Sequence, residues 1–320
     1  MDHLCGFTFA PFALKGVLGN EASRASLCAM VERTHANFVI FVPPALQDTP
    51  QSETMTYAAG NLVADEELEE MIHYAQDLNL MVALKPTVNC RNGTWRAHIN
   101  FFDEDVPCEP KWHNWFKSYT DFQLHYATIA EKTHCDMFIA GCEMVMSERR
   151  DQEWRKLIRD IRTVYTGPVS YNTDKYQEHR VTWWDEVDII SSSGYYPLED
   201  WENQLDRIEK VVLKFNKPFF FAETGCMSIA GSSNIPNDWT LKGDYAPEEQ
   251  AAWFQAMLSA CEKRDWVGGT AIWSWTGKLY SKGEQDKVHS YDVYLKSAES
   301  VIRSYYLHKK EKKYILGGIV

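Results

Sequence analysis

Short apolar runs alternate along this chain with longer segments in which apolar residues recur at the spacing of an amphipathic helix. The runs are rich in Val, Ile and Phe, and most are apolar on both faces, which is typical of parallel β-strands buried on both sides. There are eight such runs, and we predict a strand in each: Gly6–Phe12, Asn37–Pro43, Leu80–Pro86, Met137–Gly141, Pro168–Tyr171, Val187–Ser191, Pro218–Ala222 and Thr270–Trp275.

The segments between these runs predict helices. Asp65–Leu78 opens with acidic residues, which suit the N-terminus of a helix. Only a short helix is expected in the interval Gln177–Glu186, after the fifth run. The other predicted helices are Glu21–Ala36, Trp112–Thr133, Glu148–Tyr165, Trp201–Phe215, Pro247–Lys263 and Ser290–Leu307.

This alternation indicates right-handed β-α-β units, and eight of them predict an α/β fold of the (β/α)8 TIM-barrel type. The 320 residues suit one such domain, since a barrel of this kind needs about 250 residues. We expect a single barrel domain over residues 1–308 and a solvated C-terminal tail over 309–320, where lysines cluster. The alternative is an open doubly wound sheet. Such a sheet usually has a Gly-rich turn after its first strand, and the sequence contains no G-x-G-x-x-G or P-loop motif.

The charge balance narrows the classes of partner. Lys and Arg number 33 and Asp and Glu 45, which gives a net charge of −12. An acidic chain lacks the excess of Lys and Arg that binds nucleic acid, and it is poorly suited to binding anionic lipid surfaces. No stretch approaches 18 consecutive apolar residues, so no membrane span is expected. The first residues do not read as a secretory signal, so we expect a cytoplasmic protein whose eight cysteines are reduced thiols.

Aromatic residues and histidines bear on the kind of site. The 12 Trp and 16 Tyr residues fit either a Trp-rich core or a cleft that stacks ligand rings. The ten histidines form no H-x-H or H-E-x-x-H motif, so we expect no catalytic metal and no cofactor. Cys142 and Cys226 lie near the candidate carboxylates described next, but a cysteine nucleophile would need a His or cationic partner, and none is evident.

Two of the predicted strands lead directly into a carboxylate. Glu143 follows the fourth strand region and Glu223 the seventh, at the ends where barrel enzymes carry their active sites. A charged residue at such a buried position costs desolvation unless it is paired or has a task. A salt bridge to a loop would explain either residue alone. Two carboxylates facing each other across a barrel mouth instead favour a retaining glycosidase, with one as nucleophile and the other as acid/base.

The carboxylates stand within segments that resemble a known family. The segments are GFTFAPF at 6–12, LKP at 84–86 followed by Trp95 and Arg96, GCE at 141–143, GYYPL at 194–198, FAETG at 221–225 and IWSW at 272–275. Together they span nearly the whole chain and resemble the β-mannanases of glycoside hydrolase family 113, which belong to clan A of the barrel glycosidases. FAETG and GYYPL are the more specific of these segments.

This resemblance implies a role for several residues. Glu143 matches the acid/base and Glu223 the nucleophile. Tyr195, with Tyr196 as a near alternative, matches the tyrosine that hydrogen-bonds the nucleophile. Trp273 or Trp275 matches the aromatic floor under the reacting sugar. Many clan members carry Asn just before the acid/base, where it holds the sugar 2-hydroxyl. Here that position is Cys142, and Asn172 is the candidate for this task.

Four residues that end or follow the third strand are further candidates for substrate binding: Lys85, Asn89, Trp95 and Arg96. Lys85 could contact a sugar hydroxyl or pair with a carboxylate. Trp95 could be a platform for a sugar ring or an anchor for its own loop. Trp183 and Trp184, beside the expected short helix, are interpreted as packing residues.

The preferred hypothesis is therefore a retaining hydrolase of β-1,4-mannan or manno-oligosaccharides. A cytoplasmic location would favour short substrates and transglycosylation. One alternative is another clan A activity, such as a β-mannosidase or β-glucanase, in which Glu143 and Glu223 keep their roles. A second alternative is a non-catalytic sugar-binding barrel, although such proteins usually lose one of the two carboxylates, and both are present here.

Overall fold

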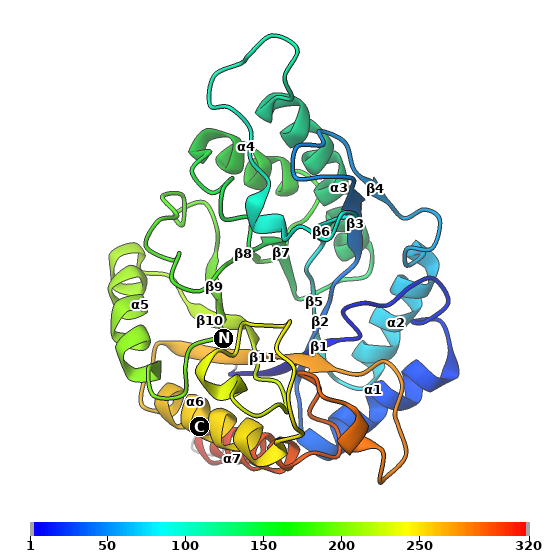
Figure 1. The fold of residues 1–320 in the computed structure, drawn as a ribbon, viewed down its shortest axis with the longest axis vertical. Helices are drawn as coiled ribbons and strands as arrows, with labels where there is room; N and C mark the ends of the chain where they lie inside the picture. Colours follow the sequence, from blue (N-terminus) through cyan, green and yellow to red (C-terminus); the bar gives the residue numbers. More distant parts are fainter. Residues whose placement is uncertain (1–2, 318–320) are drawn as a thin grey trace.

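The computed structural model describes residues 3–317, and its central feature is a closed barrel of parallel strands (Figure 1). Around the barrel the order is β1-β11-β10-β9-β8-β7-β5-β2, and each of the eight predicted runs overlaps one of these strands. The predicted (β/α)8 fold is therefore confirmed. The strands are β1 Leu4–Phe9, β2 Phe38–Phe41, β5 Met81–Leu84, β7 Met137–Cys142, β8 Val169–Thr173, β9 Ile189–Gly194, β10 Phe219–Thr224 and β11 Val267–Trp275.

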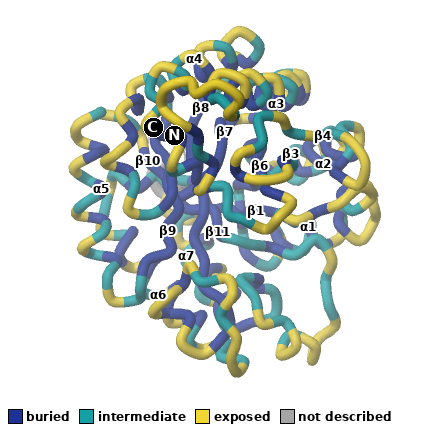
Figure 2. Tube along the Cα trace, turned by 45° about the horizontal axis from the view of Figure 1, so that its top comes forward, coloured by how far each residue is buried: buried dark blue, intermediate teal, exposed yellow. Residues whose placement is uncertain are grey.

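The pleat of each strand separates two apolar layers. In β10, Phe220 points into the barrel, where it packs with Phe38 of β2. Phe219 and Phe221 point outward into the larger layer between strands and helices. Figure 2 shows the strands as a buried centre surrounded by helices whose outer faces are exposed. This burial on both faces explains why the strands are readable as apolar runs.

Seven α-helices lie in the described part of the chain, on the outside of the barrel (Figure 1). Helix α7 packs between α1 and α6, so the last helix closes the ring beside the first. The helices are α1 Glu21–Thr34, α2 Asp65–Asp77, α3 Trp112–Lys132, α4 Asp151–Ile161, α5 Trp201–Phe215, α6 Pro247–Glu262 and α7 Ser297–Gly317. None of the described helices has the length and apolarity needed to cross a membrane.

The prediction of a short helix within residues 177–186 is wrong. This segment between β8 and β9 consists of turns. Trp183 and Trp184 are fully buried in it, and the Trp183 ring stacks on Trp154 of α4 with centroids 4.9 Å apart. Their indole nitrogens donate to the backbone carbonyls of Glu148 and Glu178. Two bulky side chains held in this way take the place of a helix, and the prediction that they are packing residues is confirmed.

The C-terminal helix differs from the predicted range Ser290–Leu307. Helix α7 begins at Ser297, because residues 290–296 form turns, and it continues to Gly317. Lys309 and Lys312 on this extension pair with Glu262 at the end of α6. Much of the predicted tail 309–320 is therefore helical, and residues 318–320 lie outside the described residues.

A small second sheet extends two barrel strands. Its strands are β3 Pro44–Gln47, β4 Thr56–Tyr57 and β6 Thr87–Cys90, in the order β4-β3-β6. Strands β3 and β6 closely follow β2 and β5 and pair in parallel, so they continue beyond the carboxyl end of the barrel. After β6 comes a 3-10 turn, η1 Arg96–His98, which contains the candidate residue Arg96. This sheet was not predicted.

Candidate active site

A cavity of about 580 Å³ lies at the carboxyl ends of the barrel strands. Its size is that of an ordinary small-molecule site. Glu143 and Glu223 both line it, so the structure brings the two carboxylates predicted from the sequence into one space. Of the other predicted residues, Asn89, Trp95, Arg96, Tyr195 and Trp273 also line the cavity.

The carboxylate of Glu223 is buried and surrounded by donors. Lys85 Nζ donates to its Oε1 over 2.5 Å, Cys142 Sγ lies 3.2 Å from the same oxygen, and Tyr195 Oη donates to Oε2 over 3.1 Å. Burial pushes the pKa of the Glu223 carboxyl upward. The charge and hydrogen bond of Lys85 outweigh burial, with help from Arg96 and Cys142, and hold this pKa below its usual value. Glu223 is therefore ionised at neutral pH.

Glu143 immediately follows β7 and accepts hydrogen bonds at both oxygens. Ser193 Oγ donates to Oε1 over 2.8 Å. Trp95 Nε1 and Arg96 Nη1 donate to Oε2 over 3.1 and 3.3 Å. Burial lowers the pKa of the Arg96 guanidinium, but the nearby negative charges of the site outweigh burial and raise it. Each of these two glutamates is thus paired with a cation, Glu223 with Lys85 and Glu143 with Arg96.

The two carboxylates lie close together. One ligating atom from each of Cys142, Glu143 and Glu223 lies within 4.8 Å of the other two, and within residues 3–317 this is the one group of His, Cys, Asp and Glu side chains so arranged. A metal ion there would compete with Lys85, which pairs with Glu223, and with Arg96, which pairs with Glu143. The thiol of Cys142 is also a poor anionic ligand, because burial and the charge of Glu223 raise its pKa well above the usual value. Burial likewise raises the pKa of Cys226 to about 12.

Irregularities in the strands turn both carboxylates toward the cavity. In β10, Phe220 and Ala222 face the barrel interior, so an unbroken pleat would point Glu223 outward. The pairing of β10 with β9 shifts register between Phe221 and Glu223, and this shift redirects the side chain. In β7 the register shifts between Ile139 and Cys142, and Glu143 itself has a φ of 53°.

The sequence left two choices open, Tyr195 or Tyr196 and Trp273 or Trp275, and the structure distinguishes between them. Tyr195 reaches Glu223, whereas Tyr196 is buried with its hydroxyl on Glu178 at 2.7 Å. Trp273 lines the cavity, whereas Trp275, the last residue of β11, is fully buried and its indole nitrogen donates to the carbonyl of Ser26. Tyr196 and Trp275 are therefore placed as packing residues.

Lys85 and Asn172 lie beneath the cavity and are fully buried. Lys85 pairs with the carboxylate of Glu223, which is one of the two expected alternatives. Asn172 accepts a hydrogen bond from Lys85 over 3.1 Å and donates to Ser193 and to the carbonyl of Thr173. Its amide is thus fully used by the protein, so this structure does not place Asn172 where it would hold a sugar hydroxyl.

Several residues that line the cavity were missed from the sequence. Trp239 lies in a polar loop after β10, and its ring centroid is 6.0 Å from that of Trp95. Phe12 is 78% exposed and contacts Trp273 edge to face. Tyr291 was assigned to the last helix, which in fact begins later. The only sequence signal for Trp239 is a large aromatic residue in a loop rich in Asn, Asp and Pro.

A third carboxyl group lines the cavity beside Glu143. Asp174 follows β8 and is 5% exposed, and Lys175 lies 3.4 Å from its Oδ1. Burial and the charge of Glu143 raise the pKa of Asp174 to about 7. Lys175 Nζ also lies 5.8 Å from the ring centroid of Trp95. Asp174 is thus a group whose charge changes near neutral pH next to a candidate catalytic carboxylate.

A pair of carboxylates at the mouth of a (β/α)8 barrel defines the class of the protein as a barrel glycoside hydrolase. Comparison with known families makes this specific. The family model described as Glycoside Hydrolase Family 113 matches residues 7–296, and the chain belongs to this family.

Solved structures agree with this assignment. A structure titled as a GH113 β-1,4-mannanase is 52% identical, with a TM-score of 0.94 over 96% of this chain and 99% of the other. The β-mannanase AaManA of Alicyclobacillus acidocaldarius, in complex with ManMIm, is 38% identical, with a TM-score of 0.93 over 97% of this chain and 98% of the other. A β-glucuronidase of Ruminococcus gnavus, at 15% identity and a TM-score of 0.64 over 95% of this chain and 50% of the other, shares the fold alone. No curated protein gives a significant match.

Proposed function

We propose that this enzyme hydrolyses β-1,4-mannosidic bonds in mannan or manno-oligosaccharides with net retention of configuration. The substrate is supported by the two family members whose titles name them as mannanases. The observation that carries the mechanism is the short separation of Glu143 and Glu223, whose nearest oxygens lie within 4.8 Å. Retaining glycosidases place their carboxyl groups about 5–5.5 Å apart, whereas inverting enzymes leave about 6.5–9.5 Å for a water molecule.

Glu223 is proposed as the nucleophile. A nucleophilic carboxylate must be ionised before substrate binds, and Lys85 and Tyr195 both donate to it. In the first step one of its oxygens bonds to the anomeric carbon as the glycosidic C–O bond breaks. The electron pair of that bond stays with the leaving oxygen, and a glycosyl ester remains on Glu223.

Glu143 is proposed as the acid/base. In the first step it gives its proton to the departing glycosidic oxygen. In the second step the resulting carboxylate takes a proton from water, whose oxygen attacks the anomeric carbon and releases Glu223. A sugar hydroxyl in place of water would give transglycosylation. In the ester Glu223 carries no charge, so the carboxylate left on Glu143 faces no second negative charge from Glu223.

The aromatic residues are proposed to bind the sugar rings. Trp273 lines the same cavity as both carboxylates, and its indole face suits the C–H surface of the reacting sugar. Trp95 fixes Glu143 by a hydrogen bond while its ring remains on the cavity wall. Asn89 and Arg96 are further candidates for contact with hydroxyl groups. The cytoplasmic location and the preference for short substrates stay predictions from the sequence.

The substrate is tested by incubating the purified enzyme with mannohexaose beside cellohexaose. Chromatography over time should show cleavage of mannohexaose only. Proton NMR in the first minutes should show the β-anomer as the initial product. An α-anomer as the initial product would contradict retention, and cleavage of cellohexaose alone would contradict the mannan assignment.

The two roles are tested by azide rescue. Glu223→Ala should abolish turnover of manno-oligosaccharides while the fold survives in circular dichroism. On a substrate with an activated leaving group, azide should rescue Glu143→Ala and give a β-glycosyl azide, because azide attacks the intermediate on the face vacated by the leaving group. Any rescue of Glu223→Ala should give the α-azide.

The matched control is Glu249→Gln, since Glu249 lies on α6 and binds the loop around Ser233. This variant should keep wild-type turnover. The opposite pair of azide configurations would exchange the two roles, and near wild-type activity of Glu223→Ala would refute the mechanism.

A further inference from the structure

A chain of buried hydrogen bonds connects the two carboxylates beneath the cavity. Lys85 Nζ donates to Oε1 of Glu223 and to Oδ1 of Asn172. The amide nitrogen of Asn172 donates to Ser193 Oγ over 3.0 Å, and Ser193 Oγ donates to Oε1 of Glu143 over 2.8 Å. Lys85 follows β5, Asn172 lies in β8 and Ser193 in β9, and all three are fully buried.

The direction of this chain is fixed by its first member. A lysine ammonium can only donate, so the atom of Asn172 that faces Lys85 is the carbonyl oxygen. The amide nitrogen then faces Ser193 Oγ and the carbonyl of Thr173, both of which accept. Ser193 Oγ accepts from Asn172 and has one hydrogen of its own. Among the described residues, the only acceptor for that hydrogen is Oε1 of Glu143.

The second oxygen of Glu143 has a different environment. Trp95 Nε1 and Arg96 Nη1 both donate to Oε2, and neither group can accept a hydrogen bond. Since each carboxylate oxygen has two lone pairs, a proton on Oε2 replaces one of these two hydrogen bonds, and it finds no acceptor among these neighbours. A glycosidic oxygen bound in the cavity, which Glu143, Trp95 and Arg96 all line, would supply the missing acceptor.

We propose that Ser193 and Asn172 are positioning residues that keep Oε1 of Glu143 as a hydrogen-bond acceptor and so place its transferable proton on Oε2. This inference rests on the proposed function, since it concerns the acid/base residue of that reaction. A proton on Oε1 instead would leave the Ser193 hydrogen and the Glu143 proton facing each other. With the amide of Asn172 oriented by the Lys85 ammonium, a turned Ser193 hydroxyl would have no other acceptor among the described residues, which disfavours that arrangement.

The arrangement persists through both steps of the reaction. When Glu223 becomes an ester, Lys85 loses an ionic partner, but its ammonium still donates to Asn172 Oδ1. Ser193 therefore keeps donating to Glu143 while Glu143 acts as a base. Other ionisable groups that influence Glu143 come from several elements and are unchanged by substitutions in the chain: Arg96, Cys142, Asp174, Tyr195, Glu223 and Tyr291.

The main test is Ser193→Ala in the full-length enzyme. Removing a donor from the ionised carboxylate should move the basic limb of the kcat/KM profile upward by about one pH unit. With mannohexaose, whose leaving group needs a proton, kcat/KM at the optimum should fall by roughly tenfold. With a 2,4-dinitrophenyl β-manno-oligoside, whose leaving group departs without one, the first step should stay near the wild-type rate.

The matched control is Ser191→Ala in the same strand. Ser191 is equally buried, and its hydroxyl donates to the carbonyl of Tyr171 rather than to a carboxylate. This variant should keep the wild-type basic limb and the wild-type dependence on the leaving group. Circular dichroism and thermal melting establish that both variants are folded. Ser193→Cys, which keeps a weak donor of similar shape, should give a smaller shift than Ser193→Ala.

Asn172→Leu tests the middle of the chain. Without the amide, Ser193 can turn and accept a hydrogen bond, so the basic limb should also move upward. Combined with Ser193→Ala it should move the limb no further, because both changes break one chain.

The proposal is overturned if Ser193→Ala keeps the wild-type basic limb, if both substrates lose activity equally, or if the two shifts add. Failure of the proposed function looks different: the wild-type enzyme would not cleave mannohexaose, or Glu143→Ala would keep full activity on it.

Discussion

At the scale of single residues, the charge balance of the site depends on one buried lysine. Lys85 is fully buried, its ammonium contacts Glu223, and it lies 5.7 Å from the ring centroid of Trp273. Removing one partner of a buried ion pair lowers the free energy of unfolding, because the other charge remains unpaired in the low-dielectric interior of the protein. The alternative for Glu223 is to take up a proton, which would disable a nucleophile.

Lys85→Met should therefore raise the pKa of Glu223 and move the acidic limb of the kcat profile to higher pH. The turnover of mannohexaose should fall most on the acidic side of the optimum, by up to about tenfold for each pH unit that the limb moves, since an adjacent opposite charge commonly shifts a carboxyl pKa by about 1–3 units. Steady-state rates between pH 4 and pH 8 measure the limb directly.

The double variant Lys85→Met/Glu223→Gln separates charge from packing. It is expected to be inactive but more stable than Lys85→Met, because neither buried charge remains unpaired. Thermal melting compares the two. If the single variant kept the wild-type acidic limb, the ionisation of Glu223 would not depend on Lys85.

The sequence predicted which residue types gather at the site, but not which neighbours they choose. Glu143 and Glu223 could be named because each follows an apolar strand. The preference for Tyr195 over Tyr196 depends on where each side chain points just beyond the end of β9, and the two are adjacent in sequence. Ser193 was missed because a serine in a buried strand carries no signal until its hydrogen-bond partner is known.

At the scale of secondary-structure elements, β7 ends in a conformation that few residues can adopt. Gly141 has a φ of 110°, and a Cβ at this position would lie 2.4 Å from the hydroxyl oxygen of Tyr119 on α3. Two residues later, Glu143 starts its loop with a positive φ. The end of this strand is thus shaped both by its backbone and by the helix packed behind it.

Gly141→Ala should destabilise the enzyme by about 1–3 kcal/mol, through backbone strain and displacement of Tyr119. It should also lower kcat, since the strand positions Glu143. Gly16→Ala is the control, because Gly16 has a φ of 83° but no atom within 4 Å of the added Cβ. Denaturant unfolding of both variants should show the larger loss for Gly141→Ala. Equal losses would mean that contact with Tyr119 contributes nothing.

The elements themselves were predictable to very different degrees. Apolar runs and helix-periodic segments alternate along the whole chain, so the existence of the barrel strands and of the helices around them could be predicted from the sequence. Strands β3, β4 and β6 are two to four residues long and stand beyond the barrel, where no repeating pattern marks them. The segment 177–186 contains helix-compatible residues, but the packing of Trp183 against α4 overrides that local tendency.

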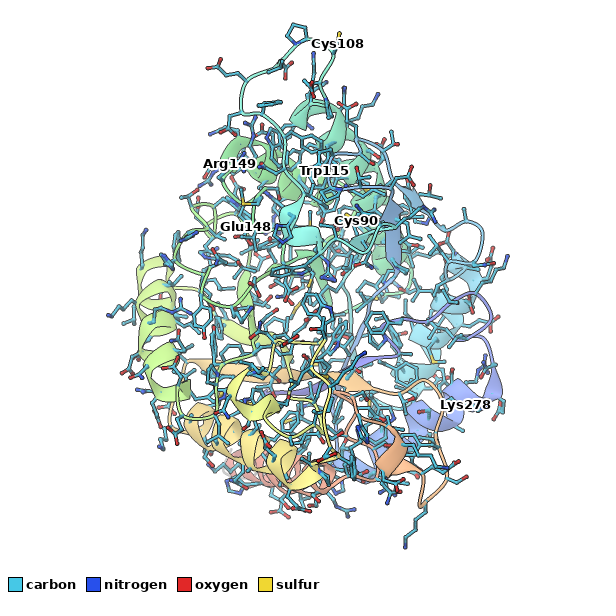
Figure 3. The ribbon with its side chains drawn as sticks, in the orientation of Figure 1. Cys90, Cys108, Trp115, Glu148, Arg149 and Lys278 are labelled. Carbon is cyan, nitrogen blue, oxygen red and sulfur yellow. The ribbon has the colours of Figure 1, made fainter. Side chains whose placement is uncertain are left out.

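At the scale of the whole molecule, a buried carboxyl group away from the reacting atoms links stability to pH. Glu148 lies in the loop between β7 and α4, the loop that also begins with Glu143, and its side chain is buried (Figure 3). Its Oε1 accepts hydrogen bonds from Tyr171 Oη and Thr173 Oγ1, each over 2.7 Å. Burial raises its pKa to about 8, although these two hydrogen bonds act in the opposite direction.

The folded protein therefore holds a proton that the unfolded chain releases at lower pH. Stability from this group is fully present below the unfolded pKa and is lost as pH rises from about 4.5 toward 8, by up to about 1.4 kcal/mol per pH unit. Glu148→Gln should remove this loss. Its melting temperature should fall less than that of the wild type between pH 5 and pH 8.

Glu66→Gln is the matched control, since Glu66 is exposed on α2. It should reproduce the wild-type pH dependence. A Glu148→Gln variant that loses stability with pH as steeply as the wild type would show that Glu148 does not hold a proton in the folded state.

The way in which β1 and α7 meet has a practical consequence. The ring of His3 lies 6.1 Å from that of Tyr305, and Tyr306 Oη donates to the carbonyl of Gly6, so His3 and β1 are held against the last helix. β1 starts at the far end of the barrel, whereas Phe12, just past its other end, lines the cavity. An affinity tag, a surface tether or a partner enzyme fused before β1 would thus lie at the end of the barrel opposite the cavity. The cavity would then stay accessible to a long polysaccharide.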